Sequence, residues 1–438
     1  MYSIKDILRI EVAPALGCTE PAAVALTTAA AGSLLPGKNL DAIELWLSPN
    51  IYKNAMAVAI PGTKGDTGIS LAAALGFYAG DPALKLEVLD PVNDESLRLA
   101  RDFVAADKVE VNLLSDKTDI YIRATLQAGD NSAEAVIERT HDNLVMLARD
   151  GNALNDHPLL SGTSADHSEL DRLEDFLRSQ TLEQLLILVD GMDDDDLQFV
   201  MRGVECNLEL ARHGLALGSG LGVGKTLERL AREGLTCKDM IMEARILTSA
   251  AADARMSGVK LPAMSSAGSG NHGLTAVLPI WAVRPHVKGL SDTNVLKAVA
   301  LSHVITGYIK AHTGRLSAVC GCSVAAGAGA AAGITYLMGG NLEHIAGAIK
   351  NLIGDLAGVI CDGAKASCAL KLATAAGAAV QSALFALHGL TVGEHDGIVA
   401  FTPEQTMKNM GQISTQGMIE TDRTVLQIMV DKQFSTRF

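Results

Sequence analysis

The feature that most constrains the fold of this chain is the stretch from Leu316 to Gly340, which contains no charged residue. A stretch of this length is sufficient to cross a bilayer. Most of its residues are Gly, Ala, Ser and Cys, however, and Ala and Gly favour membrane insertion far less than Leu, Ile or Phe do. We therefore expect a buried helix that packs closely against its neighbours, and no membrane span.

The composition of the whole chain is also typical of closely packed helices. The 438 residues are 48% hydrophobic but only 4% aromatic, so the apolar content is mostly Ala, Val, Leu and Ile. This length allows two or three domains and a deep site between them. Helix-like periodicity interrupted by glycine clusters extends over the C-terminal half. We predict a mainly α-helical, Ala/Gly-rich C-terminal domain over residues 201–438.

The N-terminal residues 1–155 alternate between helix-like and strand-like patterns and predict an α/β domain. The predicted elements are helices from Ile4 and over Pro21–Ser33, and strands over Ala42–Leu47, Leu84–Leu89 and Ile120–Gln127. Residues 156–200 are acidic and polar, and we predict a connecting region there. The predicted fold class is mixed α/β, with an N-terminal α/β region followed by a mainly helical domain.

Charge and cysteine content limit the partners. A net charge of -14 disfavours nucleic acid, because binding a polyanion needs clustered Lys and Arg, so a small-molecule substrate is expected. The N-terminal residues lack the apolar core and cleavage site of an export signal, which predicts a cytoplasmic protein. Seven cysteines are too few for a disulfide scaffold, and the odd number leaves at least one free. The cysteines are therefore candidates for metal binding or catalysis.

A glycine-rich segment, Gly218–Thr226, ends in the Gly-Lys-Thr of a phosphate-binding loop. Ser219 stands where that loop requires its first glycine. The preceding Val204–His213 is helix-like, whereas a phosphate-binding loop follows a buried strand. We predict a glycine loop between two helices in place of a nucleotide site.

Four cysteines in the C-terminal half form a second candidate. Cys320 and Cys322 lie in Val-Cys-Gly-Cys, and Cys361 and Cys368 lie seven residues apart. Asp362-Gly363 predicts a bend that could fold both of the later thiolates around one metal centre. Buried free cysteines acting as small hydrophobic residues are the commoner explanation of such a pattern, and the spacing alone leaves both readings open.

The segment Gly17-Cys18-Thr19-Glu20-Pro21 precedes an Ala-rich helix. Thr19 is a good N-cap residue and Pro21 a good first-turn residue, so Cys18 is expected beside a helix N-terminus. There the helix dipole lowers the pKa of a thiol and favours the thiolate. An ordinary helix start beside an inert cysteine fits the segment equally well.

A glycine-rich loop, Ser265–Gly273, precedes an apolar helix and could hold a carboxylate on its backbone N–H groups. A plain loop between helices is the alternative, and the residues alone favour it. Ser48-Pro49-Asn50 and Lys53-Asn54 form a weaker polar group of the same kind.

In this order, these segments resemble the L-cysteine desulfidase family, which is also catalogued as an uncharacterised protein family of bacteria and archaea. That family is distantly similar to the α domain of iron-sulfur L-serine dehydratases. The resemblance covers nearly the whole chain. It rests on Pro14–Pro21, Ser48–Asn50, Lys53-Asn54, Asp253–Arg255, Leu261–Ser265, Gly268–Asn271, Arg315–Ala318, Cys320 and Cys361–Ala364.

The resemblance implies a [4Fe-4S] cluster held by Cys320, Cys361 and Cys368, with Cys322 as a substitute for Cys320 only. Three protein ligands would leave one iron open as a Lewis acid. The implied reaction is β-elimination of L-cysteine to pyruvate, ammonia and sulfide, with Cys18 as the base. The implied substrate-binding residues are Thr19, Glu20, Asn50, Lys53, Asn54, Ser269, Gly270 and Asn271.

Several other functions are compatible with parts of the sequence. An iron-sulfur L-serine dehydratase is the nearest, since an open iron could equally activate a hydroxyl group. A pyridoxal-phosphate lyase would run the same net reaction but would leave the cysteines without a role. A non-catalytic iron-sulfur or redox-sensing module and a small-residue membrane protein belong to other classes. A homodimer is the expected assembly.

Overall fold

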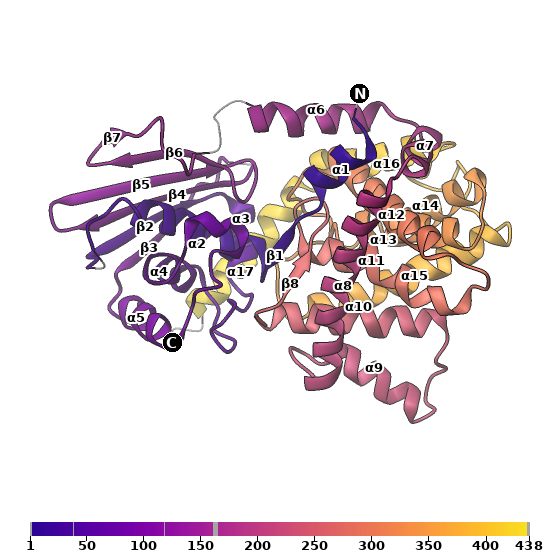
Figure 1. Ribbon diagram of the computed structural model, residues 1–438, viewed down its shortest axis with the longest axis horizontal. Helices are drawn as coiled ribbons and strands as arrows, with labels where there is room; N and C mark the ends of the chain where they lie inside the picture. Colours follow the sequence, from indigo (N-terminus) through magenta and orange to yellow (C-terminus); the bar gives the residue numbers. More distant parts are fainter. Residues whose placement is uncertain (1, 38, 118, 161–164, 436–438) are drawn as a thin grey trace.

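The computed structural model describes residues 2–37, 39–117, 119–160 and 165–435. Two hydrophobic cores account for its shape. One core is formed by buried residues between positions 22 and 147, and the other by residues 4–12 together with positions 173–410. Figure 1 shows a sheet-containing body beside a larger helical body. The predicted mixed α/β fold class is confirmed.

The sheet-containing body is built on a six-stranded sheet with the order β3-β2-β4-β5-β6-β7. Its strands are β2 (Ala42–Leu47), β3 (Val109–Leu113), β4 (Tyr121–Ala128), β5 (Asn131–Glu138), β6 (Leu144–Arg149) and β7 (Asn152–Ala153). The pair β2–β3 is parallel, and the other pairs are antiparallel. The helices of this body are α2 (Thr19–Gly32), α3 (Pro49–Ala55), α4 (Ile69–Tyr78) and α5 (Asp94–Ala105). The sheet packs on α2, since alternate residues of β4 are buried.

The predicted strands at Ala42–Leu47 and Ile120–Gln127 are confirmed as β2 and β4. The predicted strand at Leu84–Leu89 is wrong, because a 3₁₀ segment, η1 (Pro82–Glu87), occupies most of it. The Asp81 side chain accepts a hydrogen bond from the backbone N–H of Ala83, and proline fixes the first turn. The proline and the Asp81 cap therefore favour a helical turn over the strand that the apolar residues predict.

The helical body begins within the predicted connecting region and continues almost to the C-terminus. Its helices are α6 (Ala165–Ser179), α7 (Leu182–Asp190), α8 (Asp194–Leu217), α9 (Val223–Arg232), α10 (Met240–Met256), α11 (Gly270–Val283), α12 (Asp292–Thr313), α13 (Ala325–Leu337), α14 (Leu342–Leu356), α15 (Cys368–Leu387), α16 (Pro403–Gln412) and α17 (Ile419–Ser435). Short segments η2 (Arg284–His286) and η3 (Ile413–Gly417) follow α11 and α16.

The uncharged stretch of the sequence forms a loop followed by α13, which packs against α11, α12, α14 and α15. The predicted buried helix of small residues is confirmed, because every residue of α13 except Tyr336 is buried. Among the described residues, α15 alone is long and apolar enough to cross a membrane, and 56% of its most apolar window is buried inside the protein. Buried core helices share this property.

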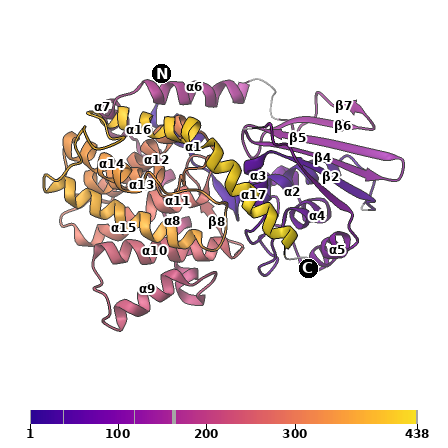
Figure 2. The ribbon, with the colours of Figure 1, turned by 180° about the vertical axis from the view of Figure 1, so that it is seen from behind.

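The two bodies are tied together near both ends of the chain. Helix α1 (Ile4–Glu11) contributes Ile4, Ile7 and Leu8 to the core of the helical body. Strand β1 (Pro14–Leu16) then pairs antiparallel with β8 (Pro262–Met264), which lies between α10 and α11. At the other end, α17 crosses from the helical body to α3 (Figure 2). The junction between the bodies is therefore held by segments distant in sequence.

The glycine-rich segment 218–226 is, as predicted, a loop between two helices, α8 and α9. It surrounds a carboxylate of the protein itself, because Asp253 of α10 accepts hydrogen bonds from the backbone N–H groups of residues 221–224. Gly224 N–H donates to Asp253 Oδ2 at 3.0 Å, and Asp253 is 1% exposed. A helix N-terminus with converging N–H groups favours an anion. This arrangement explains why the segment looks like a phosphate-binding loop.

Burial raises the pKa of Asp253 to about 6, against the opposing effect of the backbone N–H donors. The folded protein then binds this proton more tightly than the unfolded chain, whose carboxyl group titrates near 3.8. This contribution to stability is present below that value and is lost as the pH rises through about 6. Asp253→Asn removes the titration, so we expect its free energy of unfolding to rise by roughly 3 kcal/mol relative to that of the wild type over this interval. Urea unfolding at a series of pH values measures the difference.

The exposed Asp130 provides the matched control for this titration. Asp130→Asn should follow the wild-type pH profile throughout. Parallel profiles for Asp253→Asn and the wild type would contradict the assignment.

Candidate active site

A small cavity of about 80 Å³ lies where the two bodies meet. The sheet-containing body contributes Cys18, Glu20, Asn54 and His141 to its wall. The helical body contributes most of the predicted ligands and substrate-binding residues: Ser269, Asn271, Cys320, Cys322, Cys361 and Cys368. Segments separated by more than three hundred residues thus meet at one enclosed site.

The backbone brings the two cysteine segments side by side. Val319 and Ile360 form an antiparallel bridge, so Cys320 and Cys361 occupy diagonal positions on the same face of the pair. Cys320 N–H donates to Val359 O at 2.8 Å, and Cys361 N–H donates to Ala318 O at 2.6 Å. Cys368 begins α15 after the bend that Asp362-Gly363 predicts. The pairing places thiols from two loops and one helix start on the same wall.

The thiols on this wall differ in acidity. A hydrogen bond from the Cys322 thiol lowers the pKa of Cys320 to about 6, and Ser323 Oγ also donates to its sulfur. The pKa of Cys322 is raised well above its ordinary value, because that thiol donates the bond. Burial raises the pKa of Cys361 and brings that of Cys368 to about 11. Of the four thiols on this wall, Cys320 is therefore the one that its surroundings favour as a thiolate.

This donor set fits a metal-sulfur group in its chemistry. Four thiols line one cavity, and the nearby ammonium group of Lys371 lowers the pKa of both Cys320 and Cys361. Thiolates are the ligands that iron-sulfur clusters use. Among the described residues, however, no three His, Cys, Asp or Glu side chains already stand in metal-holding geometry. The ligand roles of Cys320, Cys361 and Cys368 stay predictions.

The motif that carries Cys18 is held by close backbone packing. Cys18 is itself the N-cap of α2, so the predicted N-cap at Thr19 is wrong by one residue. Gly17 has a φ of +69°, and a Cβ there would lie 2.3 Å from Pro61 Cγ. Glycine is required at that position both by its conformation and by the available space. This turn points Cys18 into the cavity.

Cys18 is a neutral thiol in the structure, which differs from the thiolate that its place at a helix start predicts. Burial raises its pKa well above the ordinary value, and the nearby Glu20 carboxylate adds to the effect. The Cys18 thiol donates a hydrogen bond to Glu20 Oε2 at 3.0 Å, and the Thr19 hydroxyl donates to the same oxygen at 3.1 Å. His141 Nε2 lies 3.8 Å from Glu20 Oε1. Glu20 is therefore positioned to accept the Cys18 proton.

Arg255, near the end of α10, connects two walls of the cavity. Its guanidinium group donates to Asn271 Oδ1 at 2.9 Å and to Gly17 O at 2.5 Å, and the side chain is 1% exposed. Gly270 does not line the cavity, but a Cβ there would lie 2.4 Å from Arg255 Nε. Arg255 therefore fixes Asn271 relative to the turn that carries Cys18.

Three other predicted substrate-binding residues lie behind the cavity wall: Thr19, Asn50 and Lys53. Lys53 is 1% exposed and is engaged in an ion pair with Asp422 of α17. The Asn54 side chain reaches the cavity, but its amide N–H donates to Asn50 O at 2.8 Å. Lys53 thus holds the C-terminal helix against α3, and its expected contact with substrate stays a prediction that this ion pair disfavours.

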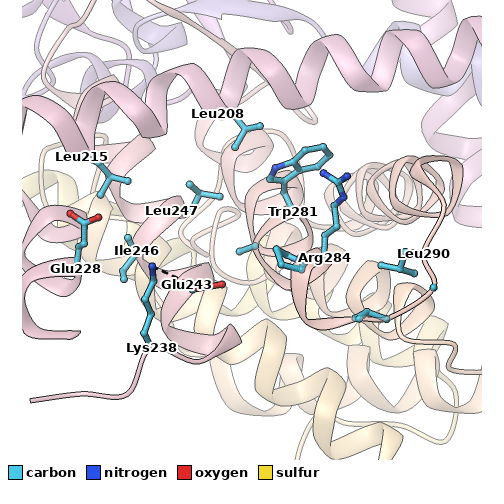
Figure 3. Close-up of a pocket in the computed structure, with 14 residues that line it drawn as sticks. Leu208, Leu215, Glu228, Lys238, Glu243, Ile246, Leu247, Trp281, Arg284 and Leu290 are labelled. Atoms are coloured by element: carbon cyan, nitrogen blue, oxygen red, sulfur yellow. Dashed lines mark ion pairs between the residues drawn. The ribbon is translucent and has the colours of Figure 1, made fainter. Parts of the chain in front are cut away.

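Larger hollows lie outside the thiol cavity. A groove of about 630 Å³ shares His141, Gly268 and Arg315 with the cavity and adjoins it. Figure 3 shows a pocket of about 650 Å³ with Leu208, Leu215 and Trp281 on its walls and an ion pair between Lys238 and Glu243. None of the described residues that line that pocket is a cysteine. Its size is typical of ligand sites, but the reactive groups converge at the smaller cavity.

Comparison with known proteins decides the family. The model of the serine dehydratase alpha chain matches residues 86–427. This chain belongs to that family. It is also 56% identical over 436 residues to a UPF0597 protein of Desulfatibacillum aliphaticivorans, with 99% of each chain covered. UPF0597 proteins of Clostridioides difficile and Caldanaerobacter subterraneus are 44% and 39% identical, covering 97% and 98% of this chain and 99% and 98% of their own.

Membership of the serine dehydratase alpha-chain family confirms the resemblance to the α domain of L-serine dehydratases. The family is associated with lyase-type dehydratases and linked to iron-sulfur enzymes. The matched residues include every predicted cluster ligand, whereas Cys18 and the segment around Asn50 precede them. The family assignment therefore applies most directly to the cluster-side wall of the cavity.

Several residues that line the thiol cavity carried no predicted role: His141, Arg255, His272, Lys310, Arg315 and Lys371. Two of them carry a sequence signal, because Lys310 and Arg255 are charged residues in mostly apolar or Ala-rich stretches of their helices. A charged residue on a buried helix face needs a partner, which marks it as a candidate. His141 lies in a turn between β5 and β6, and nothing in its surrounding sequence distinguishes it.

The two bonds of Arg255 predict the effect of a conservative substitution. Arg255→Lys keeps the positive charge but reaches only one of the two acceptors, leaving the other buried and unpaired. We expect a loss of about 1–3 kcal/mol in the free energy of unfolding. Arg98→Lys, in an exposed ion pair with Asp102, should change stability by less than about 0.5 kcal/mol. Equal urea midpoints for the two variants would remove Arg255 from this role.

Proposed function

We propose that this protein is an L-cysteine desulfidase, which converts L-cysteine and water to pyruvate, ammonia and sulfide. The observation that carries the proposal is the convergence of Cys18, hydrogen-bonded to Glu20, with four further thiols at one enclosed cavity. Dehydratase family membership supports lyase chemistry. The small-molecule substrate, homodimeric state and cytoplasmic location are part of this proposal.

The thiol wall is the proposed cofactor site. Cys320, Cys361 and Cys368 would hold a [4Fe-4S] cluster, which would supply an open iron as a Lewis acid for the substrate sulfur. The Cys322 thiol donates a hydrogen bond to the sulfur of Cys320, and we assign Cys322 only as a substitute for Cys320 as a cluster ligand. The positive charge of Lys371 favours thiolates at this wall.

The Cys18–Glu20 pair is the proposed base. Glu20 accepts the thiol proton of Cys18, and the thiolate so formed removes the α-proton of the substrate. Cys18 is 5% exposed, so this thiolate would have little contact with bulk water. The hydrogen bond to Glu20 therefore replaces the helix dipole as the means by which Cys18 becomes basic.

The remaining steps require little of the protein. Loss of the α-proton and of the β-sulfur as sulfide leaves aminoacrylate, which tautomerises to an imine. Hydrolysis of the imine gives pyruvate and ammonia. Asn271, fixed by Arg255, and Ser269 lie on the cavity wall and would orient the polar groups of the substrate.

An iron-sulfur L-serine dehydratase is the second candidate, and the family that the chain matches favours it. The same base and the same open iron would expel water in place of sulfide. The two functions differ only in the leaving group, so a comparison of substrates distinguishes them.

The proposed function predicts a brown protein after anaerobic purification that releases sulfide and pyruvate from L-cysteine faster than pyruvate from L-serine. Cys361→Ser should lose the colour and the turnover together, because it removes a ligand. Cys237→Ser, at an exposed cysteine, should keep both. Faster turnover of serine would establish the dehydratase, and a colourless, inactive protein after cluster reconstitution would refute both functions.

The proposed base predicts a different phenotype for its two members. Cys18→Ser should retain wild-type iron and acid-labile sulfide but abolish turnover. Glu20→Gln removes the proton acceptor, and we expect kcat to fall by roughly 10²–10⁴-fold. Iron analysis and sulfide release measure the two effects separately. Full activity in Cys18→Ser would exclude Cys18 from the mechanism.

A further inference from the structure

The basic side chains that line the thiol cavity differ in whether they have a partner. Six of them belong to the described part of the chain: His141, Arg255, His272, Lys310, Arg315 and Lys371. Five are engaged: Arg255 with Asn271 and Gly17, Arg315 with Glu11 and Glu174, Lys371 with Asp362, His141 with Glu20, and His272 with Ser266 O. The ammonium group of Lys310 has neither a hydrogen bond nor an ion pair with a carboxylate among the described residues, and the charged groups that act on it are Arg315 and the thiols of Cys320, Cys322 and Cys361.

Lys310 is also almost wholly removed from solvent. It lies on α12 and is 3% exposed, and its neighbours Tyr308, Ile309 and Ala311 are buried. A buried ammonium group without a partner costs several kcal/mol in folding free energy. Packing alone therefore does not explain a lysine at this position, and an anion inside the cavity would.

The other groups expected to bind a carboxylate are engaged elsewhere. Lys53 forms its ion pair with Asp422, and the Asn54 amide donates to a backbone oxygen. Lys371 is bound to Asp362 beside the proposed cluster ligands. An amino acid in this cavity would thus find one cation free among the described residues that line it.

We propose that Lys310 binds the α-carboxylate of the amino acid substrate. This inference rests on the proposed lyase function, since it assumes an amino acid in the thiol cavity. It assigns substrate recognition to α12, in addition to the loop at Ser269–Asn271. Lys310 would set the orientation in which the α-proton faces Cys18 and the sulfur faces the thiol wall.

The test measures binding without turnover, by anaerobic calorimetry with L-alanine, which has no leaving group. Lys310→Met removes the charge with little change in volume, and we expect its Kd for L-alanine to rise roughly 10- to 100-fold. L-Alaninamide, which lacks the carboxylate, should bind equally to the variant and the wild type. Lys350→Met is the matched control, because the ammonium group of Lys350 on α14 donates to Phe401 O and the residue is not among those that line the cavity.

Each outcome of this test decides the assignment. Equal binding of L-alanine by Lys310→Met and the wild type would overturn it, as would the absence of any binding by the wild type. A loss of iron in Lys310→Met with an unchanged Kd would make Lys310 a counter-ion of the cluster instead. Carboxylate-dependent binding in a wild type that turns over neither cysteine nor serine would refute the proposed function and leave the Lys310 assignment standing.

Stability provides a second readout. Because Lys310→Met exchanges a buried charge for an apolar side chain of similar size, we expect a melting temperature no lower than that of the wild type. Lys310→Gln repeats the binding test with a polar replacement if the Met variant does not fold.

Discussion

The interaction on which the site depends is the pair of hydrogen bonds from Arg255 to Gly17 O and Asn271 Oδ1. These acceptors belong to segments more than two hundred residues apart, one before α2 and the other at the start of α11. Buried bonds from a charged donor are stronger than neutral ones and tolerate little displacement. The distance between Cys18 and the opposite wall is therefore set by one side chain of α10, and Asp253, two residues earlier, anchors that helix to the loop before α9.

Segments near both ends of the chain make contacts that hold the two bodies together. Helix α1 packs in the helical body, β1 pairs with β8, and α17 returns to bind Lys53 of α3. Ion pairs of the partly buried Arg315 with the buried Glu11 and the partly buried Glu174 lie at the junction beside the cavity. Segments near both ends of the chain therefore hold the two bodies together at the junction where the cavity lies.

Much of this arrangement could be predicted from local sequence, and the exceptions have identifiable physical causes. The strand-like pattern correctly predicted β2, and the small uncharged residues of α13 correctly indicated a buried helix. The pattern failed at η1, where Pro82 and the Asp81 cap replaced a strand. The expected thiolate at Cys18 failed because a local dipole is weaker than the burial and the Glu20 charge that only the tertiary fold supplies. The partners of Lys53 and Arg255 are equally non-local, so no spacing rule reveals them.

The central claim is that the thiol cavity holds a [4Fe-4S] cluster with one iron open to the substrate. Mössbauer spectroscopy of the ⁵⁷Fe-loaded protein, recorded anaerobically before and after addition of L-cysteine, tests it most directly. The account predicts a cluster spectrum in which one iron site changes when L-cysteine is added and the others do not. A spectrum without a cluster signal, or a cluster signal that does not change when L-cysteine is added, would contradict the account.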